Sequence, residues 1–110
     1  MMEPSVPREP TRVHEVAARL RITRLALKLT QRRLCQLTGL STTAWNNAET
    51  GDSRIGVDSA ILLCQATGVT LDWIYRGSRV GLPTGISEAI ALIEREPPRP
   101  KKPRASARSQ

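Results

Sequence analysis

The sequence has no phenylalanine and only two tryptophans and one tyrosine among its 110 residues. With 3% aromatic residues, any hydrophobic core has to consist mainly of Leu, Ile, Val and Ala, which favours short packed helices. Trp45, Trp73 and Tyr75 are also too few to provide a stacking surface for unpaired bases. This scarcity argues against a protein that binds RNA or single-stranded DNA.

Cysteine and histidine are equally scarce. Cys35 and Cys64 lie far apart, and His14 is the single histidine, so no spacing typical of a zinc site is present. We expect both cysteines to be reduced thiols in apolar surroundings. The sequence also has no plausible nucleophile-and-base arrangement and no phosphate-binding glycine loop. It therefore predicts no metal, no cofactor and no enzymatic activity.

Long apolar runs are missing as well. No stretch approaches the ~20 apolar residues that a membrane span needs, and residues 1–10 lack the apolar centre of an export signal. We therefore expect no membrane association and a cytoplasmic protein. Residues 1–10 contain three prolines and little to bury, which predicts a disordered N-terminal arm.

Basic residues outnumber acidic ones. Seventeen Lys and Arg against ten Asp and Glu give a net charge of +7, which suits a polyanionic partner such as nucleic acid. Five of the basic residues lie in residues 97–110, a stretch with no acidic or large apolar residue. We expect a disordered basic tail there, which either holds phosphates loosely or acts as a plain solubilising extension.

The rest of the chain is predicted to form short helices. Apolar residues such as Val13, Val16 and Leu20 recur at steps of three and four, which indicates a first helix over about 13–27 with Thr11 as its cap. The next four helices each begin after a Thr, Ser or Gly and end before a glycine. They are expected at 31–38, 42–50, 57–67 and 71–76.

Two helices have an apolar pattern that raises a packing question. The centre of the fourth, AILLCQA, is apolar nearly all round, so we expect its neighbours to enclose it. A sixth helix over about 85–96 carries an apolar stripe of Ile86, Ala89, Ile90 and Ile93. That stripe is expected either to fold back on the core or to pair with a second subunit.

The helices at 31–38 and 42–50 are joined by a tight turn, as in a helix-turn-helix. At about 100° per residue, four polar residues share one arc of the second helix, opposite Ala44, Trp45 and Ala48. Thr and Asn are mediocre helix formers, yet their small side chains can bind base edges, and Asn can pair with adenine N6 and N7. We call these four residues the polar face: Thr42, Thr43, Asn46 and Asn47.

The segments LTQRRLCQLTGLSTTAWNNAETG and IGVDSAILLCQATGVTLDWIYRG resemble the Cro/C1-type helix-turn-helix domain, or XRE family, of bacterial and phage regulators. The resemblance spans residues 16–77 and includes Gly39, the Leu40-Ser41 pair, Glu49-x-Gly51 and the closing GVTLDW. It implies an all-α fold, a compact five-helix bundle like that of the lambda repressor, over residues 11–80. A C-terminal helix within 81–96 would then serve packing or dimerisation.

The resemblance also implies a function. A protein of this family is expected to bind double-stranded DNA sequence-specifically through the major groove, as a homodimer, and to act as a transcriptional regulator, specifically a repressor, associated with the nucleoid when bound. The implied base contacts are the polar face, Thr42, Thr43, Asn46 and Asn47. The implied contacts with the DNA backbone are Gln31, Arg32, Arg33, Thr50 and Arg54.

Four positions depart from the family pattern. Lys28 replaces a frequent glycine, Thr23 a frequent leucine, Ala48 a larger apolar residue, and Gly56 a frequent serine cap. A second hypothesis is an antitoxin or adaptor whose main partner is another protein. The basic tail has no apolar anchors for such a partner, whereas the stripe of the sixth helix keeps the hypothesis open.

Overall fold

The protein is all-α, as predicted. The computed structural model describes residues 11–95, and this range contains helices and no strand. The N-terminal arm and the basic tail of the sequence-based prediction lie outside the described residues. The helices are α1 (Thr11–Ala26), α2 (Gln31–Thr38), α3 (Thr42–Thr50), α4 (Val57–Thr67), α5 (Leu71–Arg76) and α6 (Thr84–Arg95).

Local signals determine most helix ends. The side chains of Thr30, Ser41 and Thr70 each accept a hydrogen bond from a backbone N–H in the first turn of the following helix. The helices α2 to α5 each end at a glycine with positive φ, and their bounds match the prediction. The bounds of α1 differ, since it begins at Thr11, which is therefore a helical residue and not a cap. Helix α6 begins one residue earlier than expected.

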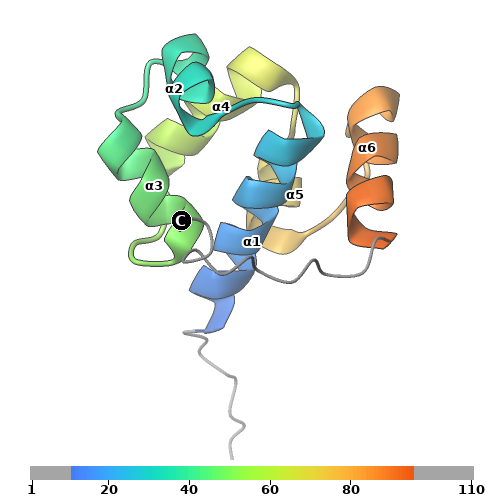
Figure 1. Cartoon of the computed structure of the whole chain (residues 1–110). Coiled ribbons are helices and arrows are strands. Elements are labelled where there is room, and N and C mark those ends of the chain that lie inside the picture. Colours follow the sequence, from blue (N-terminus) through green and yellow to red (C-terminus); the bar gives the residue numbers. More distant parts are fainter. Residues whose placement is uncertain (1–10, 96–110) are drawn as a thin grey trace, which may run out of the picture.

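Helix α1 is the centre of the bundle. It packs against α3, α5 and α6, and in Figure 1 it lies between α3 on one side and α6 on the other. The core around it includes both tryptophans, and Leu and Ile supply most of the remaining large buried side chains. The fully buried large residues are Leu20, Leu34, Trp45, Leu63, Trp73, Ile74 and Ile90. The core is thus aliphatic with two aromatic anchors, as the composition indicates.

Hydrogen bonds attach the short helix α5 to α1. Arg19 donates from Nε to the carbonyl of Ile74 at 3.0 Å and from Nη2 to that of Tyr75 at 3.2 Å. These carbonyls lie near the C-terminus of α5, where a helix leaves acceptors unsatisfied. Tyr75 in turn donates its hydroxyl to the carbonyl of Ile55 at 2.9 Å. A helix of six residues is therefore held by partners outside itself.

The structure explains Thr23, one of the departures from the family pattern. Its side chain is fully buried, and its hydroxyl donates to the carbonyl of Arg19 at 2.7 Å. The same oxygen accepts a hydrogen bond from Nε1 of Trp73 at 2.8 Å. A leucine would leave this buried indole N–H without an acceptor, which costs free energy. Thr23 therefore supplies the hydrogen-bond acceptor that the buried indole of Trp73 in α5 requires.

Lys28, a second departure from the family pattern, has a backbone conformation that glycine adopts more easily than other residues. Its φ is +61°, in the left-handed region, and it lies in the connection between α1 and α2. A side chain in this region costs about 1–2 kcal/mol relative to glycine. The backbone between α1 and α2 therefore has a left-handed conformation at this position, even though the residue is a lysine and not a glycine.

Helix α6 folds back on the core. Ile90 is 0% exposed, and the helix packs against α1. Arg79, in the loop before α6, forms an ion pair with Glu94 and lies 5.6 Å from the centre of the Trp73 ring. Of the two packing alternatives left open by the sequence, the structure has the intramolecular one.

The expectation that α4 is enclosed is wrong. Ala60 and Leu63 are buried, but Val57 is 58% exposed, Leu62 is 41% exposed, and Ile61 is exposed to a similar degree. The reason is that α4 packs mainly against α2 and α5, so part of its circumference has no neighbouring helix. An apolar pattern around a whole helix therefore marks, in this chain, a helix with one exposed apolar side.

Candidate nucleic-acid interface

The polar face of α3 is largely exposed. Thr42, Thr43 and Asn46 are exposed, and Asn47 is half-buried. On the opposite side Trp45 and Ala48 are buried in the core, as predicted. Ala44, which helical geometry places on the same side, is nevertheless exposed. It lies about 100° from Trp45 around the helix and so falls at the edge of the buried side.

The C-terminus of α3 lies close to the beginning of α1. The carbonyl of Asn47 accepts hydrogen bonds from Thr50 Oγ1 and from the backbone N–H of Ser53, each at 3.2 Å. Gly51 has a φ of +87°, and a Cβ atom at this position would lie 2.6 Å from Nδ1 of His14. Glycine is therefore required here both for the backbone conformation and for the close approach of α1.

A nearly buried carboxylate joins the first three helices. The Glu49 side chain is 4% exposed and accepts hydrogen bonds from Arg24 Nε at 2.6 Å and Arg24 Nη2 at 3.1 Å. It also accepts from Trp45 Nε1 at 2.5 Å and from Gln31 Nε2 at 3.1 Å. We call these four residues the Glu49 hub: Arg24, Gln31, Trp45 and Glu49. Because the hub links α1, α2 and α3, it sets the position of the helix-turn-helix relative to the core.

The hub keeps the Glu49 carboxylate ionised. Burial has the largest single influence and by itself raises the pKa of Glu49. Hydrogen bonds from Arg24, Gln31 and Trp45, together with the charge of Arg24, outweigh burial, and the pKa of Glu49 lies below its ordinary value of 4.5. Glu49 therefore acts as a hydrogen-bond acceptor at neutral pH.

This lowered pKa predicts a loss of stability in acid. A carboxyl group with a depressed folded-state pKa contributes stability above its unfolded value, about 4.5, and the contribution disappears as the pH falls through the folded-state pKa. We expect the free energy of unfolding to fall between pH 6 and pH 3 by less in Glu49→Gln than in the wild type. Urea denaturation at the two pH values measures this difference.

Glu88→Gln, which alters an exposed carboxyl, is the control and should retain the wild-type fall in the free energy of unfolding. An identical fall in all three proteins would contradict the role of the hub.

The residues predicted to contact the DNA backbone lie at or close to the surface. Arg32, Arg33, Thr50 and Arg54 are exposed, whereas Gln31 is half-buried. The structure brings Gln31 next to the polar face, since its Nε2 lies 3.3 Å from Oδ1 of Asn46. Arg33 donates to the side chain of Gln36 at 3.2 Å within α2. The first residue of α2 is thus in contact with the polar face of α3.

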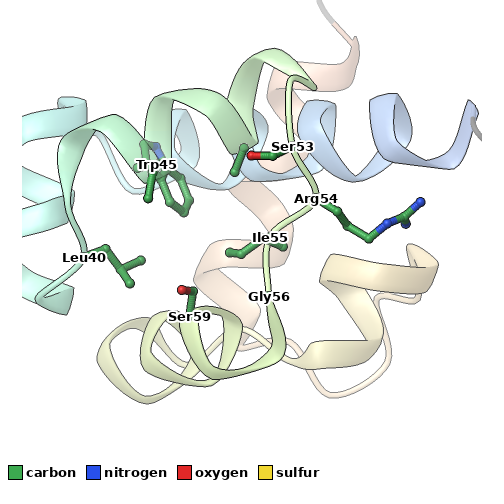
Figure 2. Close-up of a pocket in the computed structure, with 9 residues that line it drawn as sticks. Leu40, Trp45, Ser53, Arg54, Ile55, Gly56 and Ser59 are labelled. Atoms are coloured by element: carbon green, nitrogen blue, oxygen red, sulfur yellow. The ribbon is translucent and has the colours of Figure 1, made fainter.

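A small pocket lies beside α3, between that helix and α4 (Figure 2). Its volume is about 90 Å³, much less than a drug-sized ligand occupies. Trp45, Ile55 and Ser59 line it, and Figure 2 shows Arg54 extending away from Trp45 and Leu40. Within residues 11–95 no cluster of His, Cys, Asp or Glu has the arrangement of a metal site.

The two cysteines are thiols and do not form a disulfide with each other. Cys35 is buried and Cys64 is half-buried. Burial raises the pKa of both thiols, and in Cys35 the nearby charge of Glu49 raises the pKa further. Both groups are therefore poorly suited to act as thiolate nucleophiles.

Sequence reasoning missed the hub, although one signal of it was present. Glu49 is the single acidic residue between residues 16 and 51, a stretch rich in arginine. It follows Trp45 by four residues, which places both on the buried side of one helix. A lone acid on a buried helix side within a basic region predicts a buried ion pair, but only the fold identifies Arg24 as its partner.

Comparison with protein families identifies the class of protein. The model of the helix-turn-helix domain family matches residues 15–76, more than half of the chain. The chain therefore belongs to the helix-turn-helix domain family, a class of DNA-binding domains that are typically not enzymes. DNA is accordingly the partner that the family implies.

The other comparisons found no relative. No curated protein and no solved structure matches the chain significantly. In the described part of the chain, no helix has both the length and the apolar character needed to cross a membrane.

Proposed function

We propose that this protein binds double-stranded DNA sequence-specifically and regulates transcription as a Cro/C1-type (XRE family) regulator. The observation that carries the proposal is the exposed polar face of α3, on a helix held to the core by Trp45 and Glu49. A helix whose outer side chains are small and polar fits the major groove. The resemblance and the family match support the same conclusion.

The proposed contacts divide into two groups. The polar face (Thr42, Thr43, Asn46 and Asn47) would contact base edges, where donors, acceptors and methyl groups distinguish the base pairs. Gln31, Arg32, Arg33, Thr50 and Arg54 would contact phosphates and position the domain. The N-terminus of α2 adds its unpaired backbone amides and the positive end of its dipole. We further propose that binding represses transcription by occupying a promoter.

We also propose that two copies bind together as a homodimer. Val57, Ile61 and Leu62 of α4 are exposed apolar side chains, and the first two lie four residues apart on one face of the helix. A second copy would bury them, and the α3 helices of the two copies would then lie one turn of DNA apart, about 34 Å. Helix α6 is a weaker candidate interface because its central isoleucine already packs inside the domain.

A charged substitution on α4 tests this pairing. We expect Ile61→Lys to shift the protein from dimer to monomer in sedimentation equilibrium, because a lysine in an apolar interface would be buried without a partner. Leu92→Lys, on the exposed side of α6, is the matched control and should leave the mass unchanged. A monomeric mass for the wild type, or dissociation caused by Leu92→Lys alone, would contradict the proposed interface.

The alternative of an antitoxin or adaptor loses its main support in the structure. It depended on the apolar stripe of α6 as an unoccupied surface, but Ile90 of that stripe is buried against the core. A protein partner would have to use another surface. We therefore favour DNA as the main partner.

Fluorescence anisotropy tests the proposed DNA binding. Duplexes from the promoter region of the protein's own gene are compared with scrambled duplexes at ~0.15 M salt, where non-specific binding is weak. We expect Thr42→Ala with Asn46→Ala to lose about 1–3 kcal/mol per contact on the preferred duplex only. Arg32→Ala, which removes a proposed phosphate contact, should weaken binding to all duplexes alike. Equal affinity of the wild type for every duplex would contradict sequence-specific binding and favour a protein partner.

A further inference from the structure

We propose that the pocket between α3 and α4 (Figure 2) is a binding site for a small uncharged molecule with a short branched alkyl group and one hydroxyl. The inference goes beyond the proposed function and does not depend on it. An occupant would contact Trp45 and Ala48 of α3. A small molecule in this site would therefore lie directly against the helix that carries the polar face.

The pocket exists because several residues around it have small side chains. Ala44, Ala48 and Gly56 all line it. A Cβ atom at Gly56 would meet no atom within 4 Å apart from its neighbours in the chain, so no other side chain occupies the space beside it. Ala48 and Gly56 are also two of the four positions that depart from the family pattern, in both cases toward a smaller residue. The chain itself therefore leaves this volume unfilled.

The walls of the pocket are mainly apolar. Figure 2 shows Leu40, Trp45 and Ile55 around the same space. The single ring nitrogen of Trp45 donates to Glu49 at 2.5 Å, so the indole offers the pocket no free hydrogen-bonding group. Water against such walls finds few partners, and an alkyl group that displaces this water gains free energy. The ligand therefore needs an apolar end.

Two hydroxyl groups supply the polar part of the pocket. Ser53 and Ser59 line it, and within residues 11–95 neither hydroxyl has a hydrogen-bond partner, although each can donate and accept. Among the described residues that line the pocket, Arg54 is the single charged one, and its side chain extends away from Trp45 and Leu40 in Figure 2. A charged ligand would lose its hydration without a counter-charge inside the pocket. A hydroxyl is therefore the polar group that fits.

The volume of the pocket sets the size of the ligand. In another protein, an apolar cavity of about 150 Å³ accommodates benzene, which has six carbons. In proportion, the pocket volume of about 90 Å³ suits an alkyl group of about three or four carbons, with the hydroxyl near the two serines. Isobutanol has these properties and is the probe for the test.

NMR of the full-length protein tests the site directly. Isobutanol is titrated into the ¹⁵N-labelled protein, and the indole N–H of Trp45, which lines the pocket, is compared with that of Trp73, which does not. We expect the Trp45 resonance and the backbone amide of Ala48 to shift in a saturable way, with a dissociation constant of about 1–10 mM for so small a ligand. The Trp73 resonance should stay in place, because its N–H is bonded to Thr23 in the core.

Two variants and a matched control locate the binding. Ala48 is 4% exposed and lines the pocket, so the two carbons added by Ala48→Val would occupy pocket volume and should weaken isobutanol binding at least about tenfold. Ala66→Val adds the same carbons at an exposed position of α4 outside the lining and should bind as the wild type does.

Ser59→Ala keeps the volume of the pocket but removes one hydroxyl, and it should weaken binding about 2- to 10-fold. Because the Ser59 hydroxyl has no partner in the described part of the chain, this variant should fold normally. It keeps the test decisive if Ala48→Val disturbs the core.

Three results would overturn the proposal. Parallel, non-saturating shifts of both indoles would mean that isobutanol acts only as a co-solvent. Undiminished binding by Ser59→Ala and Ala48→Val would place the ligand elsewhere. Isobutyrate, the carboxylate of the same skeleton, should bind at least about tenfold more weakly than isobutanol, and tighter binding of isobutyrate would contradict an uncharged ligand. None of these measurements involves DNA, so the inference can fail while the proposed function stands, and the reverse.

Discussion

Arg24→Met is expected to lower the free energy of unfolding by about 3–5 kcal/mol. The substitution retains an apolar side chain of similar length but removes the cation that faces Glu49, whose side chain is 4% exposed. The carboxylate would keep hydrogen bonds from Gln31 and Trp45, but its negative charge would stay buried without a counter-charge. Because domains are typically stable by only about 5–15 kcal/mol, the variant should be close to unfolding at 37 °C. Urea denaturation followed by circular dichroism measures the change.

Two further variants identify the cause of this loss. Arg21→Met changes an exposed arginine on the same helix and should alter stability by no more than about 0.5 kcal/mol. Combining Arg24→Met with Glu49→Leu removes the uncompensated charge, so the double variant should be more stable than Arg24→Met alone. An Arg24→Met protein as stable as Arg21→Met would show that the hub does not hold the helix-turn-helix to the core.

Ile90→Ala is expected to lower the free energy of unfolding by about 2–5 kcal/mol. Ile90 is 0% exposed where α6 packs against α1, so shortening it leaves a cavity in the core. Leu92→Ala on the same helix is the matched control, because Leu92 is 60% exposed and loses little burial on truncation. Thermal or urea unfolding of the two variants provides the comparison. Equal, small effects would mean that α6 does not pack on the domain in solution.

This packing also determines how pairing should be studied. A chain that ends at Gly77 lacks α6 and would expose the surface of α1 that α6 covers. Its behaviour would combine any loss of an interface with a loss of core packing. Point substitutions on the exposed side of α4 avoid this complication, since Val57 and Ile61 contribute little to the core.

The helix bounds predicted from the sequence were accurate where the signals are local. Ser41 caps α3 and Gly51 ends it, and each acts through atoms within a few residues of itself. Helix α1 begins earlier than expected because Thr11 continues the helix and does not cap it. A residue such as Thr thus marks the start of a helix only where the backbone at that residue is not helical. The sequence alone does not reveal that backbone conformation.

The features that were missed depend on distant partners. The apolar stripe of α6 would be satisfied equally by α1 or by a second copy, so its pattern could not distinguish them. The exposure of Leu62 follows from where α2 and α5 lie, and not from the composition of α4. Likewise Arg24 and Glu49 are 25 residues apart in the sequence. The residues around either one do not identify the other as its ion-pair partner.

The small size of α2 and α3 has a consequence for the behaviour of the whole molecule. These helices have 8 and 9 residues, and isolated helices shorter than about 12–15 residues are barely populated in water. They persist because Leu34, Cys35, Trp45 and Ala48 are buried in the common core. The backbone amides of α3 should therefore exchange with solvent mainly through global opening of the domain. Heating or a destabilising mutation would therefore remove the polar face in the same cooperative step that unfolds the bundle. We expect no populated intermediate that keeps a partly folded α3.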